Sequence, residues 1–303
     1  MTMKPSTVYF IPITATKKNY SEEALKVLTA LLEEEKITLG HELPLKIHPG
    51  EPGNVSYNKP ENYDGLIDFL ESKKIRTYYI ETNTVTGRRT NEKDHLVAAA
   101  EHGFTRVPFV VADGKGFTDD VAVPVPGGKY FKTAKIASLL ADKDQVLVLS
   151  HFKGHVASGF GAAVKMLGIG FASRRGKMEE HTIVTPPDNG TINWADGKNL
   201  QPNVIFRERV AEYALAASKG KHHIYITFAI NLVSDCDCDG HPMEPLYGDL
   251  GVFASTDPLA IDKACFDELA RREGKTPFDG GEMFTYAEKI GLGSQQYRLV
   301  EVT

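Results

Sequence analysis

The chain has 303 residues, of which 42% are hydrophobic and 25% are charged, and this composition excludes a disordered or fibrous protein. Its 35 basic and 40 acidic residues give a net charge of −5, so we exclude nucleic acid and acidic membrane surfaces as general partners. The three cysteines cannot supply a disulfide framework. The sequence shows no secretory signal and no run of about 18 apolar residues, so we expect a cytoplasmic protein.

Short β-rich runs alternate with amphipathic stretches in the first half of the chain. A helix between two strands returns the chain to the end of the sheet at which the first strand began. The alternation therefore predicts parallel strands with helices between them. The predicted strands are Val8–Ile13, Leu43–His48, Thr77–Thr82 and Val107–Ala112, and the predicted helices are Ser21–Lys36, Tyr63–Lys73 and Asn91–His102.

The pattern restarts near Gln145. We predict strands over 145–152 and 222–230, helices over Val156–Leu167 and Val204–Ser218, and a long surface loop over 185–203, which is rich in Pro, Gly, Asn and Asp. The fold class is therefore α/β, with mostly parallel sheets, helices on both faces and two lobes with a cleft between them. We place an N-terminal lobe at 1–140 and a C-terminal lobe at 141–303, with one continuous domain as the alternative.

Polar loops follow four of the predicted strands, at the edge of a parallel sheet where ligands gather. The first loop is HPGEPGN, in which Gly50 allows close approach of a ligand and Glu51 and Asn54 could orient it. A plain turn between strand and helix is an equally good interpretation. The other loops contain TNTVTGRR, SHFKGH and NLVSDCDCDGH.

Residues 150–181 carry the densest set of reactive groups. His151, Lys153 and His155 follow a strand, and an imidazole titrates near physiological pH, so these three are candidate catalytic groups, together with His95 on the helix 91–102. Lys165 lies in a small, apolar helical segment, where it either reaches solvent or has a function. Further candidate ligand-binding residues are Gly159 and Gly161 at the predicted start of this helix and Arg175 and Lys177 in a basic cluster.

Two cysteines and a histidine make a candidate metal site. In an extended segment Cys236 and Cys238 point to the same side, and His241 follows closely. Together they could contribute to a zinc or iron site. Ordinary unpaired cysteines in a turn are the alternative.

Several of these motifs resemble one family. KIHPGEPGN, ETNTVTGRRTNEKDH, LSHFKGHVASGFGAAVKMLGIGFASRRGKMEEH and CDCDGHPMEPLYGDLGVFASTDPLAIDKA are similar to the uncharacterised proteins grouped as domain of unknown function 362, often named iron–sulfur centre proteins. Many members have a ferredoxin-like cassette after the position of His181. Here TIVTPPDNGTINW replaces that cassette and contains no cysteine.

A shorter segment resembles nickel-dependent lactate racemases. His155, Gly159, Phe160, Lys165 and His181 form the pattern H-x3-G-F-x4-K-x15-H. The resemblance implies that His155 carries a proton, Lys165 anchors a nickel-containing cofactor or an anion, and His181 ligates nickel. The glycine-rich centre of the racemases reads GFGAA in this chain.

The residues and resemblances together predict an enzyme that depends on a transition metal (zinc, iron or nickel) or a metallocofactor. We expect proton or hydride transfer on a small anionic ligand held by Arg175 or Lys177. The alternative is a non-catalytic metal-binding or redox protein that docks to an electron-transfer partner.

Overall fold

The computed structural model describes residues 5–13, 19–183 and 200–303. A central sheet has the strand order β12-β1-β11-β10-β7-β2-β3-β4. These strands are β1 (Ser6–Pro12), β2 (Leu45–Lys46), β3 (Tyr79–Glu81), β4 (Phe109–Val111), β7 (Leu147–His151), β10 (Ile224–Ala229), β11 (Gly251–Ser255) and β12 (Tyr297–Glu301). Neighbouring strands pair in parallel except on the two sides of β11.

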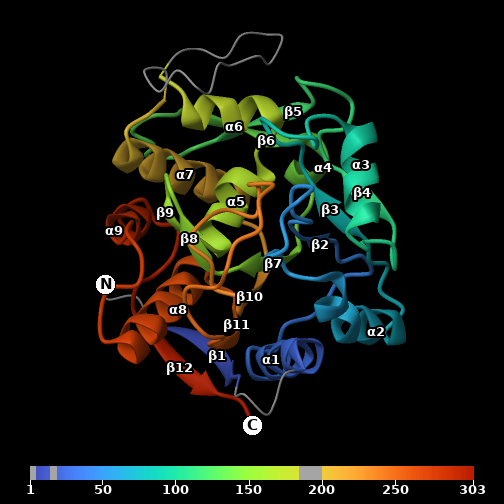
Figure 1. Cartoon of the computed structure of the whole chain (residues 1–303), viewed down its shortest axis with the longest axis vertical. Helices are drawn as coiled ribbons and strands as arrows, with labels where there is room; N and C mark the ends of the chain where they lie inside the picture. The colour runs from blue at the N-terminus through green and yellow to red at the C-terminus, as the bar shows by residue number, and fades with distance from the viewer. Residues whose placement is uncertain (1–4, 14–18, 184–199) are drawn as a thin grey trace.

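Helices cover both faces of this sheet (Figure 1). The described helices are α1 (Tyr20–Glu34), α2 (Asp64–Ser72), α3 (Glu92–Glu101), α4 (Ser138–Ala141), α5 (Ala163–Phe171), α6 (Arg174–His181), α7 (Asn203–Ser218), α8 (Pro258–Glu273) and α9 (Glu282–Lys289), with a 3-10 turn at Pro60–Tyr63. Two hairpins lie outside the sheet, β5 (Asp120–Pro124) with β6 (Thr133–Ala137), and β8 (Lys153–His155) with β9 (Gly159–Gly161).

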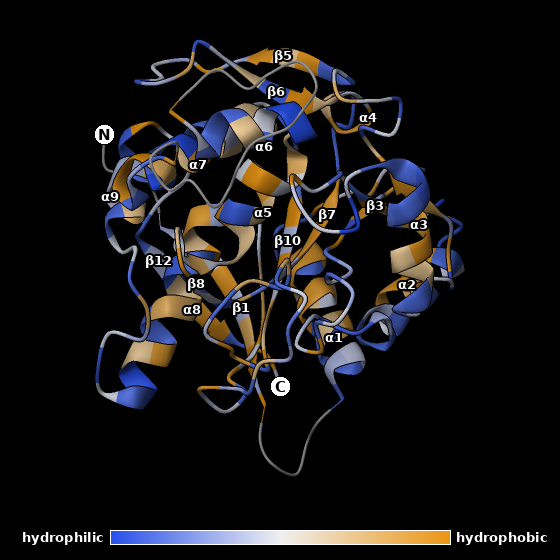
Figure 2. Cartoon of the chain, turned by 45° about the horizontal axis from the view of Figure 1, so that its top comes forward, coloured by the Kyte–Doolittle hydropathy of each residue, from blue (hydrophilic) through white to orange (hydrophobic). Residues whose placement is uncertain are grey.

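The alternation of side chains along each strand produces two apolar cores. In β7, Leu147 and Leu149 pack into the core beneath α1 and α2, whereas Val148 points into the core beneath α5, α7 and α8. Adjacent strand residues face opposite sides of a sheet, so an apolar run buries both faces at once. Figure 2 shows this hydrophobic interior along β1, β7 and β10. The predicted α/β class is confirmed.

The predicted elements of the first half all occur. The strand Ser6–Pro12 begins two residues earlier than expected, whereas the other three strands are shorter than expected, and β2 has only two residues. The helix predicted over 156–167 is wrong in its first half. Residues 153–161 form the β8–β9 hairpin, and α5 begins only at Ala163.

Glycines explain this difference. Gly159 has a φ of +81°, and a Cβ there would lie 2.2 Å from the carbonyl oxygen of Asp279. A Cβ on Gly154 would lie 2.3 Å from the carbonyl oxygen of Ser234. These residues therefore serve a hairpin that passes close to neighbouring backbone.

Strands from both predicted lobes share one sheet, since β2 pairs with β7. The division at residue 140 stays a prediction. Of the surface loop predicted over 185–203, residues 185–199 lie outside the described residues. No helix in the described part of the chain is long and apolar enough to cross a membrane.

Candidate functional site

A cavity of about 400 Å³ lies at the carboxyl ends of the central strands. Its lining includes residues that end or follow β2, β3, β7 and β10, such as His48, Thr82, Lys153 and Cys236. These four strands are parallel, so their carboxyl ends share one edge. The prediction that their polar loops converge is confirmed.

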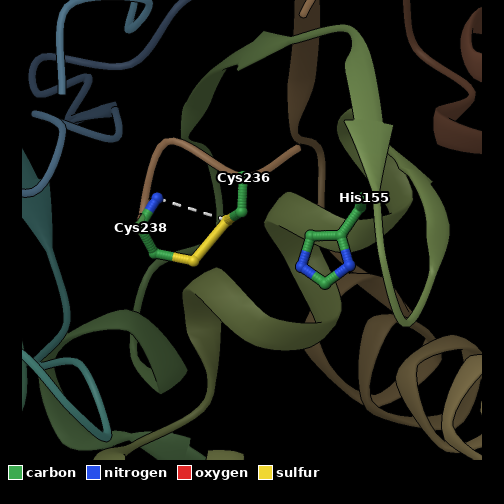
Figure 3. Close-up of side chains that lie close together, drawn as sticks. All are labelled: His155, Cys236 and Cys238. Atoms are coloured by element: carbon green, nitrogen blue, oxygen red, sulfur yellow. Dashed lines mark hydrogen bonds between the residues drawn. A yellow bond between two sulfur atoms is a disulfide. The ribbon is translucent and has the colours of Figure 1, made fainter. Parts of the chain in front are cut away.

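Two sulfurs form part of the cavity wall. Cys236 and Cys238 are joined in a disulfide (Figure 3). The Sγ of Cys236 accepts the backbone N–H of Cys238 at 3.3 Å and the Nζ of Lys165 at 3.6 Å. A nitrogen of His155 and both sulfurs lie within 4.8 Å of one another. A local disulfide was not predicted from the sequence.

The proton of His155 can be placed from its hydrogen bonds. Its Nδ1 accepts the backbone N–H groups of Ala157 and Ser158, both at 3.1 Å, so the proton of the neutral ring is on Nε2. Burial, followed by the charge of Lys165, holds the pKa of His155 well below its ordinary value. The ring is therefore neutral, and it turns its Nε2 side toward the disulfide (Figure 3).

Three side chains beside the cavity include donor atoms of the kind that bind a metal. Cys236, Cys238 and His155 have the atoms of a soft-metal site, but thiolate ligation needs reduced sulfurs, and these are bonded to each other. Ligation by Nε2 also needs a lone pair where His155 carries its proton. In this oxidised state the three residues do not fit a metal, and we derive no chemical step through one.

His181, the nickel ligand implied by the racemase resemblance, has the opposite tautomer. Its Nδ1–H donates to the carbonyl oxygen of Lys177 at 2.6 Å, so the lone pair is on Nε2, as a metal ligand requires. Burial lowers the pKa of His181 to about 4. His181 lines the cavity. Its ring nitrogens are not close enough to His155, Cys236 and Cys238 to join these three as ligands of one metal ion.

Two lysines of the cavity have no carboxylate partner among the described residues. Lys165 on α5 contacts the disulfide, and Lys177 on α6 donates to the hydroxyl of Thr82 and the carbonyl of Ala172. Burial, together with the charge of Lys153, lowers the pKa of Lys165 to about 7, and burial lowers the pKa of Lys177 to about 8. The cavity therefore favours an anion.

Lys153 and His151, two of the predicted catalytic residues, both bind Asp237. His151 donates from Nδ1 to Asp237 at 2.9 Å and from Nε2 to the carbonyl of Ile230 at 2.8 Å, so neither ring nitrogen is left for a substrate. Burial acts to raise the pKa of Asp237, but the charges of Lys153 and His151 outweigh it and hold that pKa well below its ordinary value. This buried cluster shapes the cavity wall.

The three binding residues predicted in the HPGEPGN loop, Gly50, Glu51 and Asn54, do not line the cavity. Gly50 makes the turn with a φ of +80°, and the Asn54 side chain accepts backbone N–H groups two and three residues later. Glu51 accepts the Nε of Arg89 at 2.9 Å. The loop instead positions His48 and Arg89, which do line the cavity.

The predicted anion site at a helix start is wrong. Gly159 and Gly161 belong to β9, and the first N–H groups of α5, those of Ala163 and Val164, donate to the carboxylate of Asp262 at 2.8 and 2.9 Å. A side chain of α8 therefore occupies the place expected for an anion. Gly161 still lines the cavity.

Three further predicted site residues lie away from the cavity. His95 is buried on α3, 3.3 Å from the Oδ1 of Asn83. Arg175 pairs with Asp120 at 2.7 Å, so it does not serve as the anion clamp. His241 is exposed and is not near enough to the two cysteines to join their group.

Sequence reasoning missed several lining residues, namely His48, Glu81 and Arg89. His48 and Glu81 lie at the ends of predicted strands, and Arg89 lies in the TNTVTGRR loop. Their position after parallel strands was the available signal.

Comparisons with known proteins give a family and two distant structural likenesses. No curated protein matches the chain. The lactate racemase apoprotein from Thermoanaerobacterium thermosaccharolyticum is 14% identical with a TM-score of 0.44, covering 74% of this chain and 51% of its own. A crystal structure of a Thermotoga maritima protein is 15% identical with a TM-score of 0.48, covering 86% of this chain and 60% of its own. The chain thus spans about half of the racemase.

The family model described as domain of unknown function (DUF362) matches residues 44–267. This match includes the cavity loops and the disulfide, and it agrees with the resemblance drawn from the motifs. Because the match covers well over half of the sequence, the chain belongs to the DUF362 family.

Proposed function

We propose that the protein is an enzyme that binds a small anionic substrate and removes a proton from a carbon beside a carbonyl group. Lys165 is the base, and the Nε2–H of His155 donates to the carbonyl oxygen as negative charge develops on it. One observation carries this proposal. Lys165 and His155 line the same cavity, and both lie close to the Sγ of Cys236. This sulfur lies 3.6 Å from the Nζ of Lys165 and within 4.8 Å of a His155 nitrogen.

The two groups have suitable protonation states. With its pKa lowered to about 7, Lys165 is largely an uncharged amine at slightly alkaline pH, and an amine of that kind is an effective general base. A neutral imidazole N–H polarises a carbonyl by hydrogen bonding and keeps its own proton. His155 is therefore assigned a stabilising role in place of the acid–base role predicted from the sequence.

The cavity limits the substrate. A volume of about 400 Å³ lies at the small end of ligand sites. The positive charge of Lys177, which has only neutral oxygen partners among the described residues, favours an anionic group. A small 2-oxo carboxylate satisfies both conditions, since its carbonyl makes the neighbouring C–H acidic.

Deuterium exchange tests this function. The protein is incubated in D₂O with small 2-oxo carboxylates, and loss of the C3–H signal is followed by proton NMR. Lys165→Met is expected to slow exchange by about 10²-fold or more. His155→Asn keeps an acceptor for the N–H groups of Ala157 and Ser158 but lacks the Nε2–H, and it is expected to slow exchange by about 10²-fold.

The matched control is His241→Asn, because His241 is exposed and lies outside the cavity. The exchange rate of the wild type should rise with pH through about 7 as Lys165 loses its proton. Exchange that is absent from the wild type, or that is unchanged in Lys165→Met, would show that the proposed reaction is not the function.

The disulfide supports a second candidate, a redox or metal-binding protein that works with an electron-transfer partner. Cys238 is exposed and Cys236 is buried beside Lys165, so an external thiol can attack Cys238 and release Cys236 as a thiolate next to a positive charge. Reduction would create two soft ligands for zinc, iron or nickel. Zinc binding by the reduced wild type, absent from Cys236→Ser and from the oxidised protein, is the expected result. Reduced protein that binds no zinc, iron or nickel would eliminate this candidate.

A further inference from the structure

The side chains of His48 and Arg89 meet at their terminal nitrogens in the cavity. The Nε2 of His48 lies 3.4 Å from the Nη2 of Arg89, and both residues line the cavity. A guanidinium nitrogen is always a donor. What this contact means therefore depends on where His48 carries its proton.

The proton of His48 is on Nε2. Its Nδ1 accepts the backbone N–H of Gly50 at 3.2 Å, and that acceptor role leaves the proton of a neutral ring on the other nitrogen. Burial, followed by the charge of Arg89, holds the pKa of His48 well below its ordinary value, so the ring is neutral. The N–H groups of His48 Nε2 and Arg89 Nη2 thus point toward each other. This arrangement becomes favourable only when a hydrogen-bond acceptor binds to both of them.

Arg89 has a further unmet donor. Its side chain is 0% exposed, and its Nε is fixed by the carboxylate of Glu51 at 2.9 Å. Its Nη1 has no hydrogen-bond partner within the described parts of the chain. Leaving a buried charged donor unpaired costs free energy. The terminal edge of Arg89, made of Nη1 and Nη2, is therefore held in place, and its Nη1 has no partner among the described residues.

We propose that this edge of Arg89 and the Nε2–H of His48 form a receptor for one carboxylate group of a cavity ligand. The planar fork of a guanidinium matches the two oxygens of a carboxylate, and His48 donates a third hydrogen bond to one of those oxygens. Glu51 orients the arginine by holding its Nε. This inference rests on the proposed function in one respect: the carboxylate is that of the 2-oxo acid.

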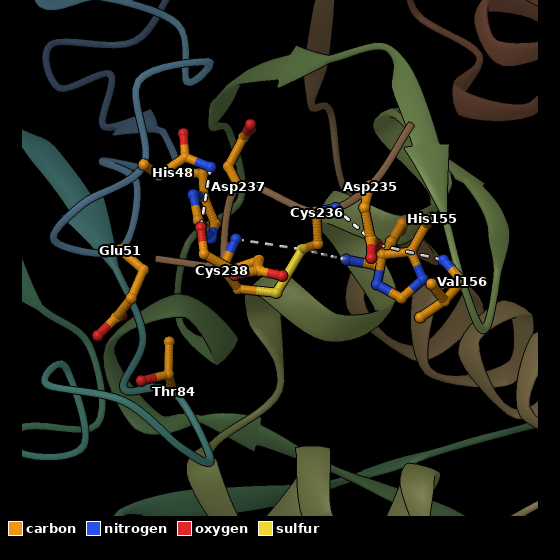
Figure 4. Close-up of a disulfide and its surroundings, with 12 residues drawn as sticks. His48, Glu51, Thr84, His155, Val156, Asp235, Cys236, Asp237 and Cys238 are labelled. Atoms are coloured by element: carbon orange, nitrogen blue, oxygen red, sulfur yellow. Dashed lines mark hydrogen bonds between the residues drawn. A yellow bond between two sulfur atoms is a disulfide. The ribbon is translucent and has the colours of Figure 1, made fainter. Parts of the chain in front are cut away.

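The position of this receptor gives the substrate a direction. Figure 4 shows His48 and Glu51 on the Cys238 side of the disulfide and His155 on the Cys236 side. A carboxylate at Arg89 would thus point the rest of a short substrate along the disulfide toward His155 and Lys165. Carboxylate recognition at His48 and carbonyl polarisation at His155 then lie on the two sides of the disulfide.

Binding of pyruvate, malonate and succinate, measured by isothermal titration calorimetry, tests the receptor. Inorganic phosphate and uncharged acetone are the comparison ligands. His48→Asn keeps an acceptor for the Gly50 N–H but removes the ε-position donor, whereas His48→Gln keeps an N–H at the ε position. We expect the dissociation constant to rise about 10-fold in the first variant and to change less than about threefold in the second.

The arginine is tested as a pair. Arg89→Gln combined with Glu51→Gln removes both charges, so that no carboxylate is left buried and unpaired, and it should weaken carboxylate binding by about 100-fold or more. Arg88→Gln is the matched control, because Arg88 pairs with Glu101 at the surface and should bind as the wild type does. Thermal unfolding of each variant verifies the fold.

The outcomes separate this receptor from the proposed reaction. If His155→Asn binds carboxylates normally but the wild type exchanges no proton, the reaction is wrong and the receptor stands. A wild type that binds none of the three carboxylates, or equal affinities in His48→Asn and His48→Gln, overturns the receptor. Phosphate binding that is tighter than carboxylate binding, with the same sensitivity to Arg89, overturns the assignment to a carboxylate.

Discussion

Replacing Lys165 by methionine is expected to stabilise the fold while it slows the proposed reaction. Folding lowers the pKa of this lysine from 10.5 to about 7, first through burial and then through the charge of Lys153. A lowered pKa means that the charged form is disfavoured in the folded state. The resulting cost to stability is complete below about pH 7, where both states are charged, and it disappears as the pH rises toward 10.5, where both are neutral.

The size of this effect follows from the shift. The difference between the two pKa values corresponds to about 5 kcal/mol. Because Lys165 borders a cavity that solvent can enter, we expect Lys165→Met to gain about 2–4 kcal/mol at pH 6. A cationic group kept at such a cost is the pattern of a functional site whose activity opposes stability.

Urea unfolding at pH 6, 8 and 10 measures the gain. The difference in unfolding free energy between Lys165→Met and wild type should be largest at pH 6 and should shrink toward zero at pH 10. Lys93→Met, a change at an exposed lysine of α3, is the control and should show no such trend. A Lys165→Met protein that is less stable than wild type, or a gain that does not depend on pH, would refute the reasoning.

Three other predictions concern the framework of the cavity. Asp237→Asn should destabilise the protein by about 3–5 kcal/mol, because it leaves buried cations without their counter-charge, whereas Asp239→Asn, at a partly exposed side chain, should change the urea midpoint little. Both Gly159 and Gly127 have positive φ, but only Gly159 lacks space for a Cβ. Gly159→Ala should therefore lower the free energy of unfolding by about 3 kcal/mol or more, and Gly127→Ala by about 1 kcal/mol. Equal losses of stability in calorimetry would contradict this. Thiol titration of oxidised protein should find no reactive thiol when folded and one, Cys265, after unfolding; three would show that the disulfide is absent.

The convergence of the loops that follow the strands could be predicted from the sequence because it depends on few assumptions. Apolar runs separated by helical stretches require parallel pairing, and parallel pairing brings the loops after β2, β3, β7 and β10 to one edge. The sequence therefore predicted a cavity that contains His155, Lys153 and Lys165, without any knowledge of strand order.

Partners distant in sequence could not be predicted in the same way. Asp262 accepts a backbone N–H at the start of α5 from a residue 99 positions earlier in the chain, and Glu51 accepts the Nε–H of Arg89, which lies 38 positions later. Arg175 is likewise removed from the cavity by Asp120, 55 residues earlier. Which carboxylate meets which cation depends on how the elements pack, and hydrophobic periodicity carries no information about that choice.

The pairing of β1 has a consequence for how the protein is made. Its two neighbours in the sheet are β11 and β12, which a ribosome synthesises only after more than two hundred further residues. During translation the Ser6–Pro12 segment therefore emerges with neither edge covered, and a bare apolar strand readily recruits strands from other chains. We expect the nascent protein to need a chaperone until its last strands arrive, and the slow search for such remote neighbours to dominate the time it takes to fold.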